Sequence, residues 1–506
     1  MFLRPVLISS TNENTVVLSS KDTNDSISRR FAIIRKDQDI YIYSNVLVVL
    51  DTLEKGTIGL TKNAFKKLKL SFDDPDEVEC RIEIRERPES FNFIKKKMSQ
   101  KDYQLTKPEI DLIVKDVISG RLSDIEKETF ILSQYYQTYQ MDEIELLCKS
   151  IATTGEIIDF PITAYDKHSL GGVPGNKVTL LIVPIVAAAG LLIPKTSSRA
   201  ITSPSGTADT MEALGCTVAF SSDEIKQIVS KTNGCIVWGG ALNLAPADDI
   251  LIKDVENPLS LNPRSMMMAS IMAKKIALGI DFMVLDIPTG KGCKVTTMEE
   301  ATVLSRAFGE LGHRVGIHVE CGITFGSLPV GHTIGPSLEA REALHALISP
   351  NGSSTSLIEK STALAGMLLE MSGKAIRGQG QNMAKEILYS GRAYEKMKQI
   401  IEAQGGDPNM KPDDIQIGQY VSEYKASAPG WPADIDNKAV TEIAQAAGAP
   451  TDKGAGIHFL VKKESVKAGD VIFRVYSNSS QKIDRVESLL PKLKPVTIEG
   501  MLLGRI

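Results

Sequence analysis

A glycine-rich stretch that runs directly into a long apolar segment constrains the fold of this 506-residue chain more than any other feature. The loop spans residues 166–177 (DKHSLGGVPGNK), and the apolar segment follows from Val178 to Pro194. Pro184 and Gly190 interrupt this segment, which is also too short to span a bilayer. We therefore predict a buried helix that follows a glycine turn.

The glycine loop has the composition of an anion-binding site. Glycines let backbone N–H groups approach an oxyanion, and the start of a helix adds positive potential. Lys167, Ser169, Lys177 and Thr179 offer charge and hydroxyl donors beside it. The spacing of a Walker loop is absent. A purely structural glycine turn between a strand and a helix is the alternative interpretation.

A second loop, residues 195–209 (KTSSRAITSPSGTAD), places several hydroxyls around one arginine and one glycine. Ser and Thr hydroxyls suit phosphate oxygens, and Arg199 can bind a phosphate through two parallel hydrogen bonds. A plain turn rich in Ser and Thr is the alternative. Two such loops in succession favour phosphate recognition over a purely structural role.

We expect four domains, because the length of the chain exceeds that of one domain and its residue pattern changes along the sequence. Residues 1–86 form a small β-rich domain, because short apolar runs at 15–18, 31–34, 40–43 and 81–85 are separated by turn residues. Residues 87–160 are expected to be helical.

The helical region carries two capping boxes. In Thr106–Glu109 and in Ser123–Glu126, the first and fourth residues can satisfy each other's backbone donors. Each box therefore predicts the start of a helix.

Beyond residue 160, apolar strand candidates alternate with helical stretches, which predicts an α/β domain over 161–410. A stretch rich in Gly, Pro and Asp at 404–435 is interpreted as loop or connection, and residues 411–506 as a terminal α/β module. The candidate strands lie at 235–238, 282–287, 315–319, 456–461 and 470–476.

Bulk composition excludes several classes of function. The formal charge of -4 and 24% charged residues provide no global cationic field for nucleic acid or an anionic membrane. The N-terminus lacks the apolar region of a signal peptide, so we expect a cytoplasmic protein. Six cysteines without a C-x-x-C pair and dispersed histidines indicate neither zinc nor disulfides, and no catalytic metal is expected.

Three spaced motifs resemble the signature of thymidine and pyrimidine-nucleoside phosphorylases. They are DKHS at 166–169 with Gly171-Gly172, PIVAA at 184–188, and GTxD at 206–209. The variant loop at 171–177, the SRAITS stretch at 198–203 and the extra N-terminal domain are closer still to the archaeal AMP phosphorylase branch. The resemblance covers residues 87–506 for the wider family and nearly the whole chain for this branch.

The resemblance implies a fold, a reaction and a site. The fold is multidomain α/β, with a central mixed sheet. The chain is expected to return to the helical domain with a later segment, residues 245–280. The reaction is phosphorolysis of a nucleoside 5′-monophosphate, AMP and phosphate giving adenine and ribose 1,5-bisphosphate, with CMP and UMP as further candidates. Inorganic phosphate is a co-substrate and no cofactor is implied. Closure of a cleft between the two domains and a homodimer or larger homo-oligomer are also expected.

The resemblance also assigns residues. His168 is implied as catalytic. The implied phosphate ligands are Lys167, Ser169, Thr179 and Ser197. The implied nucleotide ligands are Gly172, Ser198, Arg199, Ala200, Ile201, Thr202, Ser203, Thr207, Ser270, Lys274 and Lys294.

One position departs from the pattern. AMP phosphorylases carry an acidic residue that protonates the leaving base in the stretch where this chain has Asn262. An amide holds a hydrogen bond but has no transferable proton, so a purine leaving group needs Asp254, Glu256 or a bound water as the acid.

This departure keeps two other functions open. A thymidine or uridine phosphorylase tolerates an amide better, because hydrogen bonds and lysines can stabilise a pyrimidine leaving group. A non-catalytic nucleotide-binding assembly protein is the third possibility.

Overall fold

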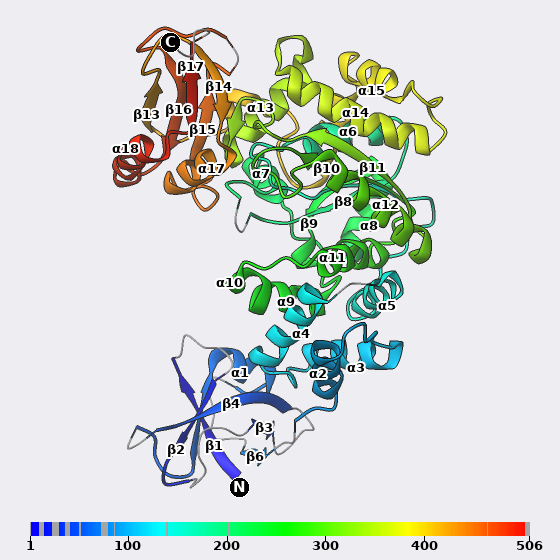
Figure 1. Cartoon of the computed structure of the whole chain (residues 1–506), viewed down its shortest axis with the longest axis vertical. Coiled ribbons are helices and arrows are strands. Elements are labelled where there is room, and N and C mark those ends of the chain that lie inside the picture. The colour runs from blue at the N-terminus through cyan, green and yellow to red at the C-terminus, as the bar shows by residue number, and fades with distance from the viewer. Residues whose placement is uncertain are drawn as a thin grey trace. The chain divides into compact units, whose positions relative to one another are not determined.

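The computed structural model (Figure 1) divides into two compact units, Met1–Gly155 with Ala245–Lys274, and Glu156–Leu244 with Lys275–Ile506. The chain therefore passes from one unit to the other three times. The structure describes residues 2–9, 15–22, 30–35, 41–49, 52–71, 79–84, 87–137, 140–200, 203–462 and 464–500.

The first unit begins with a closed barrel in the order β1-β5-β2-β4-β3-β6. Strand β1 pairs with β5 on one side and with β6 on the other, which closes the circle. All four strands predicted here are found, although residues 40 and 85 lie outside the described residues. The elements are β1 (Phe2–Ile8), β2 (Thr15–Ser19), β3 (Arg30–Arg35), β4 (Tyr41–Val49), β5 (Thr57–Thr61), α1 (Lys62–Lys67) and β6 (Cys80–Ile84).

Helices fill the rest of this unit, and both capping boxes are confirmed. The backbone N–H of Thr106 donates to Glu109 at 2.9 Å, and that of Ser123 donates to Glu126 at 3.0 Å. The returning segment packs on this helical part, with α9 on α3 and the π-helix η3 on α4. The elements are α2 (Ser90–Ser99), α3 (Lys107–Ile118), α4 (Asp124–Tyr136), α5 (Met141–Ala152), α9 (Pro246–Leu251), η3 (Ile252–Glu256), α10 (Asn257–Leu259) and α11 (Arg264–Ala277).

The second unit contains a central parallel sheet. Its strands run β11-β10-β7, and a parallel bridge between Ala164 and Leu192 leads to β8-β9. A mixed sheet was expected, and this detail is wrong for the described strands, whose pairings here are all parallel. Helical crossovers between successive strands return the chain in the same direction. The strands are β7 (Tyr165–Ser169), β8 (Ile193–Ser197), β9 (Gly234–Trp238), β10 (Phe282–Thr289) and β11 (His318–Phe325).

The strand predicted at 315–319 begins later than expected. Helix α12 (Met298–Val315) continues to its C-cap Gly316, where φ is 82° and the left-handed backbone ends the helix. The strand β11 then starts at His318.

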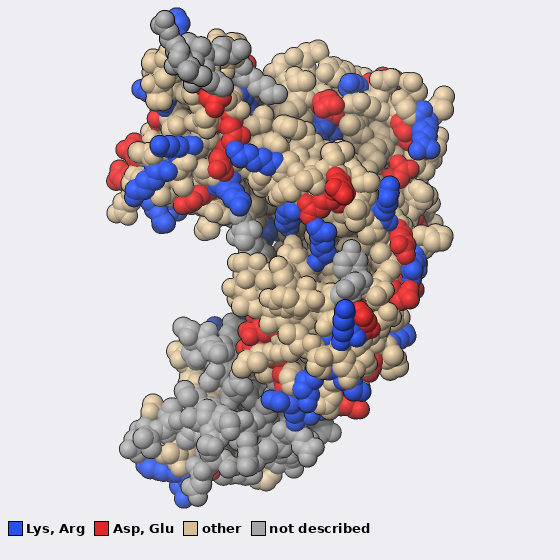
Figure 2. All heavy atoms as spheres, in the orientation of Figure 1, with Lys and Arg blue, Asp and Glu red and all other residues tan. Residues whose placement is uncertain are grey.

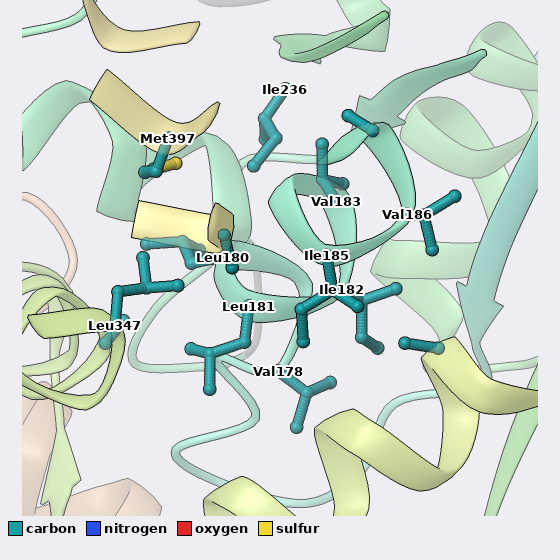
Figure 3. Packing of buried hydrophobic residues seen from close by; sticks show 14 of the residues in the cluster. Val178, Leu180, Leu181, Ile182, Val183, Ile185, Val186, Ile236, Leu347 and Met397 are labelled. Carbon is teal, nitrogen blue, oxygen red and sulfur yellow. The ribbon is translucent and has the colours of Figure 1, made fainter. Parts of the chain in front are cut away.

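The predicted apolar helix is α6 (Thr179–Ala188), and it lies at the centre of the core of this unit (Figure 3). Its side chains from Thr179 to Ala187 are all buried. Ile236, Leu347 and Met397 from three other elements pack around it. Each large apolar side chain buried here contributes about 2 kcal/mol. Within the described part of the chain, no helix is long and apolar enough to cross a membrane.

The remaining helices of the α/β part surround this sheet and α6. They are α7 (Thr207–Ala213), α8 (Ser222–Thr232), η2 (Gly239–Ala241), α13 (Pro336–Ile348), η4 (Pro350–Gly352), α14 (Thr355–Met371), α15 (Gly380–Tyr389) and α16 (Arg392–Ala403).

The C-terminal part has its own core and a sheet in the order β12-β15-β16-β13. Two strands, β13 and β14, lie within 404–435, so the interpretation of this whole stretch as loop is wrong. Pro432 is tolerated in β14 because the strand belongs to a two-stranded sheet and carries a bulge there. The elements are β12 (Thr333–Ile334), η5 (Pro412–Asp414), β13 (Tyr420–Lys425), β14 (Trp431–Ile435), α17 (Asn437–Ala446), β15 (Gly456–Phe459), β16 (Val471–Ser477), α18 (Ser480–Leu493) and β17 (Val496–Glu499).

Lys177 fastens the glycine loop to the segment that precedes α13. Its ammonium donates to Val330 O at 3.0 Å, to Thr333 O at 2.9 Å and to Glu342 Oε2 at 2.8 Å. The side chain is fully buried. Its charge is therefore used inside the fold and not, as the sequence suggested, at the loop.

Two glutamates on α13 respond in opposite ways to this environment. Burial raises the pKa of Glu339 to about 7 against the opposing charge of Lys177. Burial also acts to raise the pKa of Glu342, but the ion pair with Lys177 outweighs it and lowers this pKa to about 2. Native Glu339 keeps a proton that the unfolded chain loses near pH 4.5, so its contribution to stability falls as pH rises from there to about 7.

We predict that Glu339→Gln raises the melting temperature more at pH 8 than at pH 5, because the variant has no carboxylate to ionise. Glu342→Gln is the matched variant on the same helix, and it leaves Lys177 buried without its carboxylate. It should cost about 3 kcal/mol at both pH values. Thermal unfolding followed by circular dichroism measures both effects. An equal effect of Glu339→Gln at the two pH values would contradict the raised pKa.

Candidate active site

Three neighbouring strands of the second unit bring polar residues to the same region of the parallel sheet. In the register of the sheet, Ser169 on β7 lies opposite Asp286 on β10, and Asp286 lies opposite Gly322 on β11. Ligands of open α/β sheets bind at the carboxyl ends of parallel strands. Ser169 is the last residue of its strand, so this region is the first candidate for a binding site.

The carboxylate of Asp286 collects two hydroxyls and two ammonium groups. Ser169 Oγ donates to Asp286 Oδ2 at 2.8 Å, and Thr324 Oγ1 donates to Oδ1 at 2.6 Å. Lys360 Nζ lies 3.1 Å and Lys167 Nζ lies 3.8 Å from Oδ2. All but Ser169 and Thr324 are buried. Two residues assigned to phosphate, Lys167 and Ser169, are thus side by side around one carboxylate.

The charges of this cluster do not cancel. Burial would raise the pKa of Asp286, but Lys360 and Lys167 outweigh burial and hold it below its usual range. Burial lowers the pKa of Lys167 to about 8, against the attraction of Asp286 and together with the repulsion of Lys360. Two ammonium groups share one carboxylate, so the cluster has a formal surplus of one positive charge and is suited to an anion.

The glycine loop approaches a second glycine-rich loop, after β10. A Cβ atom at Gly172 would lie 3.3 Å from the backbone nitrogen of Lys294, and φ at Gly172 is 87°. Both the close approach and the left-handed backbone require glycine here. Gly172 and Lys294, which the resemblance assigns to the nucleotide, are therefore neighbours. Asn176 of the glycine loop donates to Ser169 Oγ at 3.2 Å.

Two side chains of the second unit, Trp238 and Glu212, hold Arg199. Its guanidinium lies 4.2 Å from the ring centroid of Trp238, and Nη2 lies 2.6 Å from Glu212 Oε1. Lys453 from the C-terminal part bonds the other oxygen of Glu212 at 2.5 Å. Burial acts to raise the pKa of Glu212, but Lys453 and Arg199 lower it. Stacking on Trp238 orients the guanidinium plane, and two cations again share one carboxylate.

The rest of the Ser/Thr loop folds back on the start of α7. Asp209 Oδ2 accepts from the backbone N–H groups of Ala200 at 2.8 Å and Gly206 at 3.0 Å. Gly206 packs so closely that a Cβ atom there would lie 2.7 Å from Ser198 O. Ser203 Oγ donates to the carbonyl of Ser205. Of the remaining residues assigned to the nucleotide in this loop, Thr207 is the first residue of α7, and Ile201 and Thr202 lie outside the described residues.

Three further assigned residues lie on adjoining elements. Ser197 ends β8, and Thr179 is the buried first residue of α6. His168 precedes Ser169 on β7, and side chains alternate along a strand, so His168 points to the opposite face of the sheet from Lys167 and Ser169.

A second buried cluster occupies that opposite face of β7. Asp166 Oδ2 lies 2.5 Å from Lys275 Nζ, and its Oδ1 lies 3.3 Å from Lys195 Nζ. Burial lowers the pKa of Lys195 to about 7, although Asp166 opposes this shift. Lys195 belongs to β8, so the cluster joins β7 to the strand that enters the Arg199 loop.

In the first unit, Ser270 and Lys274 meet on one carboxylate. Ser270 Oγ donates to Asp248 Oδ2 at 2.7 Å, and Lys274 Nζ lies 2.7 Å from the same oxygen. Ser270 and Lys274 are four residues apart on α11 and share one helical face, which is thus directed at the fully buried Asp248. Burial would lower the pKa of Lys274, but Asp248 and Asp249 outweigh it and raise the pKa.

Asn262 is exposed in the loop before α11. Of the alternative acids, Asp254 is ion-paired with Lys127 in the same unit. Glu256 lies at the end of the π-helix η3 and is half-buried.

The acidic partners of these lysines and Lys360 were not predicted from the sequence. The sequence patterns gave no role to Asp248 or Asp286, and Lys360 lies in a helix segment that also contains other polar residues. A charged residue within a segment that is predicted to be buried is the signal for such residues, since an unpaired charge is rarely buried.

Comparisons with known proteins identify the family of this chain. Residues 162–394 match the model described as "Glycosyl transferase family, a/b domain", and residues 431–494 match "Pyrimidine nucleoside phosphorylase C-terminal domain". Anthranilate phosphoribosyltransferase from Thermus thermophilus has a similar fold, with a TM-score of 0.51 at 17% identity, over 62% of this chain and 99% of that one.

Relatives named AMP phosphorylase match nearly the whole chain. The protein of Thermococcus kodakarensis is 55% identical over 83% of this chain and 83% of its own. That of Thermococcus sibiricus is 51% identical over 92% and 91%, and that of Methanococcus maripaludis is 46% identical over 98% and 97%. This chain therefore belongs to the AMP phosphorylases, within the family of pyrimidine nucleoside phosphorylases.

Proposed function

We propose that this chain is an AMP phosphorylase, a pentosyltransferase of nucleotide catabolism that converts AMP and phosphate into adenine and ribose 1,5-bisphosphate. One observation carries the proposal beyond family membership. In the second unit three carboxylates are each shared by two cations, and two of them, Asp286 and Glu212, lie at the loops whose residues suit phosphate, whereas Asp166 lies on the opposite face of β7. A reaction between inorganic phosphate and a 5′-phosphorylated nucleoside needs two such anion sites.

In this mechanism an oxygen of inorganic phosphate attacks C1′ of the ribose, and the bond from C1′ to the base breaks. The electron pair of that bond goes to the base, which takes up a proton. Positive charge develops on the sugar and negative charge on the base, so catalysis is positioning plus electrostatic stabilisation. Lys167 and Ser169 hold the attacking phosphate, with Thr179 and Ser197 as further ligands.

The leaving base requires a different group of residues. We assign Ser270 and Lys274 to the base, with Asp248 as the residue that positions both of them. The raised pKa of Lys274 keeps its ammonium charged, so it stabilises negative charge on the base through its N–H groups. Asn262 stands at the proton-donor position but supplies only a hydrogen bond. The proton then comes from solvent or from a carboxylic acid such as Glu256.

Asn262 favours one second candidate, a phosphorylase of thymidine or uridine, because a pyrimidine can leave with hydrogen-bond stabilisation. CMP and UMP are intermediate cases, since they combine a pyrimidine with the 5′-phosphate that Arg199 would bind. We also propose that the enzyme acts in the cytoplasm as a homodimer or larger homo-oligomer. On the face shown in Figure 2, acidic and basic side chains are interspersed among the described residues.

Purified protein supplied with AMP and phosphate should release adenine and ribose 1,5-bisphosphate, while adenosine, thymidine and uridine should react far more slowly. Chromatography of bases and sugar phosphates measures both products. Lys167→Ala is the inactive control. Faster turnover of thymidine or uridine than of AMP would favour the nucleoside phosphorylase. Failure of every substrate to exceed the Lys167→Ala rate would favour a non-catalytic binding protein.

Arg199→Met should raise KM for AMP by about 10- to 100-fold, because a charge-assisted hydrogen bond contributes about 1.5–3 kcal/mol. KM for phosphate should change little. Arg377→Met, which removes an exposed arginine between α14 and α15, is the matched control. An equal rise of both KM values in Arg199→Met would place Arg199 outside the nucleotide site.

The catalytic efficiency with phosphate should fall as pH rises through about 8, because Lys167 of the free enzyme loses its proton there. In Lys167→Arg the guanidinium stays charged, so this decline should disappear even if the overall rate is lower. Initial rates at varied phosphate from pH 6.5 to 9.5 give the profile. The same decline in Lys167→Arg would assign it to another group.

A further inference from the structure

Lys360 is a buried cation to which the proposed mechanism gives no role. It lies on α14, and its side chain is 7% exposed. Its ammonium is 3.1 Å from Asp286 Oδ2, yet it makes no hydrogen bond that meets geometric criteria with any described residue. A buried ammonium whose hydrogen-bonding capacity is unused costs free energy, so this position calls for a partner that the protein itself does not supply.

Lys360 reaches Asp286 because a glycine on β11 lets helix α14 pack close to the sheet. Gly322 on β11 lies beside Asp286 in register, and a Cβ atom there would lie 2.8 Å from Leu364 Cδ2 and 3.3 Å from Met367 Sδ. Lys360, Leu364 and Met367 are spaced at i, i+4 and i+7 and share one face of α14. The missing side chain at residue 322 therefore lets α14 approach the sheet closely enough to deliver Lys360.

The charges around Asp286 indicate what kind of partner is missing. Lys167 and Lys360 together carry two positive charges against the single carboxylate. Ser169 and Thr324 add two hydroxyl donors at the same carboxylate. Hydroxyl groups and surplus positive charge thus converge on Asp286 from two strands, β7 and β11, and from α14. A small tetrahedral dianion satisfies such a set, because its oxygens accept hydrogen bonds in several directions.

We propose that Lys360 is a second cationic ligand of inorganic phosphate, placed beside Lys167 and delivered by α14. This inference rests on the proposed phosphorolytic function and extends it. Asp286 then acts as a positioning residue that holds both ammonium groups and both hydroxyls in place until the anion arrives. The alternative is that Lys360 only neutralises Asp286 within the fold.

The test compares Lys360→Met with Lys360→Arg. Phosphate binding is measured by isothermal titration calorimetry, and KM is measured separately for phosphate and for AMP. Lys360→Met should weaken phosphate binding by about 10- to 100-fold and raise KM for phosphate in parallel, with KM for AMP nearly unchanged. Lys360→Arg should recover most of the affinity, because it restores the charge.

Two outcomes would overturn the inference. One is unchanged phosphate affinity in folded Lys360→Met. The other is an equal rise in KM for phosphate and for AMP in Lys360→Met that Lys360→Arg does not reverse. This result would indicate a purely structural role for Lys360.

A measurement on the wild-type protein covers the case in which Lys360→Met does not fold. Anomalous diffraction from crystals soaked in arsenate locates the arsenic atom of the anion. This atom should lie about 4 Å from Lys360 Nζ. An arsenate bound at Ser169 but well beyond contact with Lys360 overturns the inference.

Calorimetry also separates this inference from the proposed function. Phosphate binding needs no turnover, so wild-type protein that binds phosphate through Lys360 but releases no adenine from AMP would contradict the function alone.

Discussion

Burial of carboxylates inside the parallel sheet is the constraint on which the rest of the second unit depends. Asp166 and Asp286 lie on neighbouring strands, and each is fully enclosed and bound by two lysines. Desolvation of an isolated carboxylate costs far more than a domain can supply, so each must have cations beside it. Because two lysines are used where one would balance the charge, a surplus of positive charge remains.

The two carboxylates use this constraint differently. Asp166 ties three segments together on one face of β7, and its partner Lys195 leads into the Arg199 loop. Asp286 gathers its donors near the carboxyl end of β7, and ligands of open α/β sheets bind at the carboxyl ends of the strands. The same physical arrangement is a structural tie on one face of the strand and, on the other face, the anion site that we propose.

Much of the architecture was readable from the sequence. The capping boxes at Thr106 and Ser123, the buried helix α6 and most strands depend on local patterns, which agree here with the tertiary packing. The wrong predictions of secondary structure concern segments whose conformation depends on the elements packed against them. Residues 315–319 combine a helix end with a strand start, and 404–435 contains edge strands whose polar composition is that of a loop.

By itself the sequence determined the kind of chemistry, because glycines, hydroxyls and cations that are close along the chain show which ligand the loops suit. It also singled out Lys167, Ser169 and Arg199 as candidate ligands. Only the tertiary structure decided which carboxylate holds each of them, and that Lys360 joins Lys167 and Ser169 at Asp286 from a helix almost two hundred residues further along the chain. Sequence patterns report the periodicity of one element, whereas the pairing of buried charges depends on which elements pack together.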